Sequence, residues 1–192
     1  MIFGITGRKR SGKDTVADHL IGHHGFTKYQ IASPLKQAVH ALYGWDMDKL
    51  ETDDKEIHDD TYGISPRQAM QFMGAEFNKY MSQHFPQYAE VTNTKLYMMR
   101  MLEYIKLHPD QDIAIPDVRM PFTAKAIRDI GGVMVRVERG TNPTGDQHDT
   151  ERFVDTMDVD VVIRNDGTLE DLFAATESAL QGLRDKEKER EC

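Results

Sequence analysis

The residues best suited to chemistry form the run GRKRSGKDT, from Gly7 to Thr15. This run has the spacing G-x-x-x-x-G-K of a phosphate-binding loop, and it stands between an apolar stretch over 2–6 and a segment with helical character. Glycines let the backbone curl so that successive N–H groups face phosphate oxygens. The helix N-terminus adds partial positive charge, and Lys13 can reach the β- and γ-phosphates. The sequence therefore predicts a nucleoside triphosphate site whose loop contacts include Gly7, Ser11 and Gly12.

The residue after Lys13 departs from the usual motif, in which a serine or threonine hydroxyl binds Mg²⁺. Here Asp14 follows the lysine, and Thr15 comes next. Either Thr15 takes the magnesium role, or Asp14 acts on the ion through water or on the acceptor. Asp14 could also be only an acid that the helix dipole favours in a first turn. This variation is typical of a subset of small-molecule kinases, and not of GTPases or motor ATPases.

A second pair of polar residues, Asp117 and Arg119, follows the apolar run over 112–116. Ligands of open α/β sheets bind beyond the carboxyl ends of the strands, and residues two apart on an extended chain project the same way. Asp117 could serve magnesium or a ligand hydroxyl, and Arg119 could clamp a phosphate with its planar fork. The alternative is a structural ion pair at the end of a strand.

Arg67 and Gln71 lie four residues apart on a helix expected to begin at Ser65-Pro66, so they share a face. The arginine could bind the phosphate of an acceptor, and the glutamine could bond to the edge of a base; Gly74 follows them. The alternative is an ordinary exposed helix face.

Arg139 stands at the end of an expected strand over 133–138, just before a turn-rich loop over 140–151. It is placed to enter the site when this loop closes as a lid, where developing phosphoryl charge rewards a cation. Asn165, in the turn after the last strand, is expected near the adenine. The histidines, including His23 and His24, show no metal-like partner set along the sequence.

The elements that position these residues alternate along the chain. Strands are expected over 2–6, 28–32, 112–116, 133–138 and 159–163. Helices are expected over 16–21, 33–43, 94–107 and 123–130, and from Thr168 to the end. Another helix follows Ser65, with apolar positions at helical spacing at Ala69, Met70, Met73, Phe77, Tyr80 and Met81. Ser33, Ser65 and Thr168 are expected to cap their helices. This order predicts an α/β fold with a mainly parallel sheet.

Composition narrows the function further. With 24 basic and 32 acidic residues the net charge is −8, which argues against a nucleic-acid polymer as partner. Residues 46–60 carry eight acids against two lysines and are expected to form a surface loop or a short helical excursion. No apolar run approaches the ~20 residues that a membrane span needs. The single cysteine, Cys192, excludes an intramolecular disulfide and suits the reducing cytoplasm.

Taken together, six segments resemble the deoxynucleoside monophosphate kinases of tailed bacteriophages. The resemblance covers most of the chain except 46–60 and 82–93, and its most specific parts are the GKDT loop and the PDxR segment. The segments are RKRSGKDT, KYQIASPLK, SPRQAMQFMGAEF, IPDVRMPFTAKAIRDIGGVMVRVERG, GDQHDTE and VVIRNDGTLEDLF.

The resemblance implies a three-layer P-loop NTPase fold of the NMP-kinase type, as one kinase domain over 1–192. It implies an acceptor-binding helical part over 44–110 and a lid over 140–151. It also implies transfer of the γ-phosphoryl group of ATP to a deoxynucleoside monophosphate with Mg²⁺. Arg10, Gly12, Lys13, Asp14 and Thr15 would then serve ATP and the reacting phosphates. The acceptor would be held by Arg67, Gly74, Tyr97, Asp117 and Arg119, and the protein would act in the cytoplasm of a host cell. The methionine- and tyrosine-bearing helices, by contrast, are the basis for expecting a homodimer.

Two other functions fit parts of the pattern. A GKD-type loop with an S/PDxR segment also occurs in the phosphomevalonate kinases of animals, but the spacing of Arg67, Gln71, Gly74 and Glu76 favours a nucleotide acceptor. A P-loop module that binds nucleotide without catalysis is the other alternative. It is disfavoured because Lys13, Arg119 and Arg139 would gather like charges without any charge transfer to stabilise.

Overall fold

A computed structural model describes residues 1–92, 95–140 and 153–191. The chain divides into two compact units. Unit 1 joins Met1–Gln30 to Leu107–Cys192, and unit 2 comprises Ile31–Lys106. The expected phosphate-binding loop lies in unit 1, whereas Arg67 lies in unit 2.

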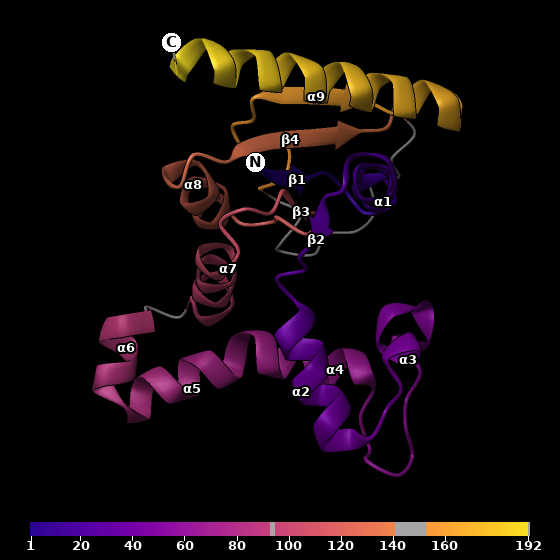
Figure 1. Cartoon of the computed structure of the whole chain (residues 1–192). Helices are drawn as coiled ribbons and strands as arrows, with labels where there is room; N and C mark the ends of the chain where they lie inside the picture. Colours follow the sequence, from indigo (N-terminus) through magenta and orange to yellow (C-terminus); the bar gives the residue numbers. More distant parts are fainter. Residues whose placement is uncertain (93–94, 141–152, 192) are drawn as a thin grey trace. The chain divides into compact units, whose positions relative to one another are not determined.

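Unit 1 is built on a parallel sheet with the strand order β2-β3-β1-β4-β5 (Figure 1). Its strands are β1 (Ile2–Thr6), β2 (Thr27–Lys28), β3 (Ile113–Ile115), β4 (Val133–Glu138) and β5 (Val161–Arg164). In the centre, Phe3 lies opposite Ala114 on one side and Val133 on the other. The parallel sheet is confirmed, but the strand expected over 28–32 shortens to two residues at the edge of the sheet.

Helices cover both faces of this sheet. Side chains alternate between the two faces along β1, so neighbouring residues of this strand contact different helices. Phe3 and Ile5 are fully buried in a core with α1 (Lys13–His24) and α9 (Leu169–Glu191). A Cβ on Gly4 would point the other way, to within 3.0 Å of Ile127 Cδ1 in α8 (Pro121–Asp129). The three layers predicted for the fold are therefore present.

The ends of the unit 1 helices follow local rules. Gly25 ends α1 in the left-handed conformation (φ 70°), which glycine adopts at little cost. Thr168 and Asp171 exchange hydrogen bonds at the start of α9, because the Thr168 N–H donates to Asp171 Oδ2 and the Asp171 N–H donates to Thr168 Oγ1. The cap expected at Thr168 is confirmed.

Unit 2 consists mainly of helices. They are α2 (Ser33–Tyr43), α3 (Met47–Glu51), the 3-10 helix η1 (Asp53–Glu56), α4 (Pro66–Gln71), the π-helix η2 (Phe72–Glu76), α5 (Phe77–His84), α6 (Pro86–Thr92) and α7 (Leu96–Leu107), whose last residue lies in unit 1. Ser65 caps α4 in a reciprocal box with Gln68. Ser33 does not cap α2, since it is the first helical residue and Ala32 precedes it without a side-chain cap.

The π-helical turn η2 explains why the apolar spacing after Ser65 is only half right. Ala69 and Met70 are buried as expected, but Tyr80 is exposed, and Asn78 is buried instead. A π-turn takes about one residue more than an α-turn. The face that α5 buries is therefore rotated from the one that unbroken helical spacing predicts.

The acidic stretch over 46–60 contains the short helices α3 and η1, which confirms the expected helical excursion, and it also contributes to a core. Leu50 in α3 is 1% exposed and packs with Trp45, Val39 and Met70. The Trp45 indole N–H donates to Asp59 Oδ2 over 2.7 Å, and this bond holds the pKa of Asp59 below its ordinary value. The charged side chains of this stretch therefore lie on a segment that is anchored in an apolar core.

No helix in the described part of the chain combines the length and apolar character that crossing a membrane requires.

The anchoring of the acidic stretch can be tested by comparing two apolar residues within it. Leu50→Ala removes a fully packed side chain, so we expect it to lower the unfolding free energy of unit 2 by about 2–5 kcal/mol. Ile57, which is 58% exposed, is the matched control, and Ile57→Ala should change stability by less than about 0.5 kcal/mol. Urea denaturation followed by the fluorescence of Trp45, the one tryptophan, measures both. Equal effects from the two variants would contradict the anchoring.

Candidate active site

The loop between β1 and α1 has a backbone that only particular residues allow. Gly7 (φ 148°) and Gly12 (φ 102°) lie in the left-handed half of backbone space. A Cβ on Gly7 would come within 2.5 Å of the Val137 carbonyl oxygen, so no larger residue fits there. Arg10 also has a positive φ, of 63°, which is a strained conformation for a residue other than glycine. The loop is therefore held in a shape that an isolated peptide would not keep.

Three hydrogen bonds hold this shape. The Arg8 carbonyl oxygen accepts from the Ser11 N–H over 3.1 Å and from Lys13 Nζ over 2.7 Å. The Ser11 carbonyl oxygen accepts from Asn165 Nδ2 over 2.8 Å, in a bond that is wholly buried. Gly12 precedes α1 without any side-chain cap. This uncapped start of α1 is the arrangement found at helix starts that bind anions.

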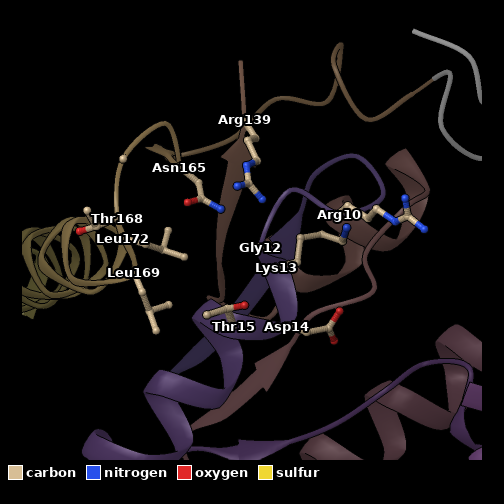
Figure 2. A pocket seen from close by; sticks show the side chains of 11 residues that line it. Arg10, Gly12, Lys13, Asp14, Thr15, Arg139, Asn165, Thr168, Leu169 and Leu172 are labelled. Carbon is tan, nitrogen blue, oxygen red and sulfur yellow. The ribbon is translucent and has the colours of Figure 1, made fainter. Parts of the chain in front are cut away.

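A cavity of about 370 Å³ opens beside the loop, within the size range of small-molecule sites (Figure 2). It brings together seven of the predicted site residues, which are Arg10, Gly12, Lys13, Asp14, Thr15, Arg139 and Asn165. Gly7 and Ser11 are buried in the loop and do not line this cavity. Figure 2 shows Arg139 reaching from the end of β4 toward the loop, beside Asn165.

The polar side of the cavity is rich in cations. Lys13 is 7% exposed, while Arg10 and Arg139 are exposed at the rim. Asp14 is also exposed, and its Oδ1 lies 3.7 Å from Lys28 Nζ. Three cations against one paired carboxylate make this side complementary to phosphate groups, whose oxygens favour such partners.

The other side of the cavity is apolar, and sequence reasoning missed it. Leu169 and Leu172, one turn apart at the start of α9, line it together with Gly167 and Thr168. Leu172 is buried, whereas Leu169 is half exposed toward the cavity (Figure 2). The available signal was the pair of leucines immediately after a capping threonine. A flat apolar ring of a ligand can pack on such a wall.

Asp117 and Arg119 lie at the carboxyl end of β3, as predicted. The N–H of Val118, between them, donates to the carbonyl oxygen of Ile5 in β1 over 3.2 Å. This bond places the pair next to the strand that leads into the phosphate loop. Both side chains are half-buried, and neither lines the cavity that Lys13 does.

The other predicted acceptor contacts lie in unit 2. Arg67 Nε donates to Glu56 Oε1 over 2.8 Å, so the acidic stretch supplies the partner of this arginine. Gln71 is exposed at the end of α4. Gly74 lies within the π-turn η2, and a side chain there would meet only Leu35 Cδ1, at 4.0 Å.

Tyr97 has a structural role that the sequence did not indicate. Its hydroxyl donates to the Met73 carbonyl oxygen over 2.7 Å, and burial is the main cause that raises the pKa of this phenol. Asn78 Nδ2 donates to the carbonyl oxygen of Gly74 over 3.4 Å, and Tyr88 Oη donates to Asn78 Oδ1 over 2.6 Å. Side chains from α5 and α7 thus donate to carbonyl groups of the π-turn, and Tyr88 of α6 holds the Asn78 amide in place.

The predicted lid over 140–151 lies outside the described residues, apart from Gly140. The Gly140 N–H donates to Asp166 Oδ1 over 2.6 Å. Beyond the lid, the Asp155 carboxylate pairs with the guanidinium of Arg8 in the phosphate loop, with Nε 3.1 and 3.2 Å from its two oxygens. This bond holds the pKa of Asp155 below its ordinary value, so the carboxylate stays charged at neutral pH.

Comparisons with known proteins bear on the family and the fold of the chain. A family model described as deoxynucleotide monophosphate kinase matches residues 1–84 and 53–176. The chain is 26% identical to the deoxynucleotide monophosphate kinase of Enterobacteria phage T4, over 93% of this chain and 98% of that protein. It is 27% identical to an Acanthamoeba polyphaga mimivirus protein provisionally given the same name, over 91% and 93%. The fold is similar to that of dephospho-CoA kinase from Campylobacter jejuni, with a TM-score of 0.53, 10% identity and coverage of 97% and 98%.

The buried bond between Asn165 and the loop generates a prediction. Asn165→Asp keeps the size of the side chain but removes the donor and directs a negative charge at the Ser11 carbonyl oxygen. We expect the dissociation constant for ATP to rise about tenfold or more at about pH 8, where the carboxyl is ionised. Equilibrium binding of a fluorescent ATP analogue measures it. Glu170→Gln, on the exposed start of α9, is the control and should bind as the wild type does. Unchanged affinity in Asn165→Asp would remove Asn165 from the support of the loop.

Proposed function

Because the chain belongs to the deoxynucleotide monophosphate kinase family, we propose that its phosphate loop and the adjoining cavity hold ATP during phosphoryl transfer. The enzyme transfers the γ-phosphoryl group of ATP to a deoxynucleoside monophosphate, giving a deoxynucleoside diphosphate and ADP. One observation carries the placement of the donor. The cavity has phosphate-binding cations at one side and an apolar wall at the other, as a nucleotide requires.

Phosphoryl transfer depends on alignment and charge stabilisation more than on covalent chemistry. Lys13 and the uncapped N–H groups of α1 hold the β- and γ-phosphates. Arg10 and Arg139, at the rim, stabilise the charge that develops as the phosphoryl group moves. The base packs on Leu169 and Leu172, and Asn165 keeps the loop in position. An ionised phosphate oxygen of the acceptor attacks, so no strong base is needed.

The donor set at the start of α1 fits Mg²⁺, which takes oxygen ligands. The Thr15 hydroxyl and the Asp14 carboxylate both line the cavity, and Asp117 offers a further carboxylate in unit 1. Thr15 would hold the ion, with Asp14 or Asp117 acting through water. A Mg²⁺ ion held there would supply positive charge that neutralises part of the charge on the phosphate groups of ATP.

We assign the acceptor phosphate to Arg119, with Asp117 beside it. The support is their position at the carboxyl end of the strand next to β1. Arg67, Gln71 and Gly74 are proposed acceptor contacts on the resemblance stated above, and Tyr97 is proposed to act by holding the π-turn that contains Gly74. Lid closure over 140–151, a homodimer and a cytoplasmic location stay predictions.

The function is tested by ADP release from ATP-Mg²⁺ in a coupled assay, with dGMP, dTMP, dCMP, dAMP and mevalonate 5-phosphate as separate acceptors. Turnover with one or more deoxynucleotides is the expected result, and it also gives the base preference. Turnover with mevalonate 5-phosphate alone would overturn the proposal. So would a protein that binds ATP but turns over none of the five acceptors.

Lys13 carries the first prediction from this mechanism. Lys13→Ala removes the buried cation of the cavity, so we expect kcat to fall by about 10²–10³-fold, the usual loss of one charge-stabilising donor. Lys9→Ala is the matched control, because Lys9 is exposed and does not line the cavity. It should keep activity within a few-fold. Circular dichroism checks that both variants fold. Near-normal turnover in folded Lys13→Ala would contradict the mechanism.

Arg119 carries the second prediction. If it binds the acceptor phosphate, Arg119→Ala should raise the KM for the deoxynucleotide by about 10–100-fold and the KM for ATP much less. Arg119→Lys should restore little, since an ammonium lacks the planar fork. Steady-state kinetics with each substrate varied in turn measure this split. An unchanged KM for the acceptor would remove Arg119 from that site.

A further inference from the structure

Among the residues that the structure describes, one group of histidine and carboxylate side chains brings three possible metal ligands together. His19 and His24 lie five residues apart on α1, and Glu177 lies on α9. Glu177 Oε1 is 2.7 Å from His19 Nε2 and 2.6 Å from His24 Nε2. The three donor atoms all lie within 4.8 Å of one another. This group belongs to unit 1 but does not line the cavity beside the phosphate loop.

One residue of this group is packed tightly by its surroundings, and the other two are partly exposed to solvent. The His19 side chain is 7% exposed, and its ring stacks on Phe173 of α9 with centroids 4.3 Å apart. The side chains of His24 and Glu177 are 20% and 47% exposed. One ligand is thus held rigidly by packing, while the other two can adjust, and water can reach the group past Glu177.

The donor types indicate which ion fits. Two imidazole nitrogens with one carboxylate oxygen form a known three-ligand zinc set, whose fourth position takes water. Imidazole suits zinc and neighbouring transition metals, whereas Mg²⁺ takes oxygen ligands. An ion about 2.0–2.1 Å from each ligand needs ligand atoms about 3.3 Å apart in tetrahedral geometry. The half-exposed Glu177 carboxylate and the His24 ring therefore have to move apart by less than about 1 Å.

We propose that His19, His24 and Glu177 bind a divalent transition metal ion of the zinc type, which clips the C-terminal half of α1 to α9. His19 Nδ1 is buried and has no hydrogen-bond partner among the described residues. Metal-bound histidines normally donate this second N–H to an acceptor, and loss of such a partner weakens binding about 10–100-fold. The site therefore binds in the micromolar range, as an accessory site. This proposal does not rest on the phosphoryl transfer or on the Mg²⁺ of the donor site.

The test is a titration of the full, untagged chain with ZnCl₂ at about pH 7.5. Isothermal calorimetry should show one ion per chain, and a 100-fold excess of Mg²⁺ should not displace it. His24→Gln and Glu177→Gln should each lower the affinity at least about tenfold. Both side chains are partly exposed, so the variants are expected to fold, which circular dichroism checks. His23→Gln is the matched control, since His23 adjoins His19 but lies outside the donor set.

A second measurement, the Tm, tests whether the bound ion stabilises the packing of α1 on α9. Zinc at about 100 times its dissociation constant should raise the Tm of the wild type by about 5–10 °C. It should leave the Tm of Glu177→Gln nearly unchanged. The proposal is overturned if zinc does not bind. It is equally overturned if both ligand variants bind as tightly as the wild type, or if His23→Gln loses as much affinity as His24→Gln.

Discussion

The backbone N–H groups of the phosphate loop must face inward, and much of unit 1 serves this one requirement. Gly7 passes so close beneath β4 that the Val137 carbonyl oxygen occupies the space of a side chain. Asn165, just beyond β5, holds the loop from the other direction through the Ser11 carbonyl oxygen. Both supports come from strands on the same side of β1. A one-residue slip at the end of β5 would turn the Asn165 side chain to the opposite face and remove its bond to the loop.

The sequence predicted those features whose cause is local. The strands over 2–6 and 133–138, the glycine frame of the loop, and the caps at Ser65 and Thr168 each depend on neighbouring residues, and the structure confirms them. The π-turn could not be predicted in the same way, because its residues also suit an α-helix. Its wide turn leaves carbonyl groups that Tyr97 and Asn78 satisfy from other parts of unit 2. The buried face of α5 shifts accordingly.

Other features depend on partners that are distant in the sequence. The charges over 46–60 predicted a surface loop or a short helical excursion but not its long-range contacts, in which Leu50 and Trp45 anchor it and Glu56 reaches Arg67 in α4. His19 and Glu177 are 158 residues apart, so their meeting depends on how α1 and α9 pack on one face of the sheet. The position of Asp117 and Arg119 beside β1 was predictable, because strand ends in a parallel sheet share an edge.

The two leucines at the start of α9 have a consequence for donor selectivity. Leu169 and Leu172 present a broad hydrocarbon surface, and the Thr168 hydroxyl is already engaged with Asp171. Such a surface can pack against the face of a purine, but it offers no partner to the hydrogen-bonding groups along the edge of the ring. Apolar walls discriminate weakly between isosteric ligands, whereas a dedicated hydrogen-bond donor or acceptor discriminates strongly. If the cavity holds the donor as proposed, its apolar wall suits a permissive pocket, in which the triphosphate supplies most of the binding and the identity of the base matters little.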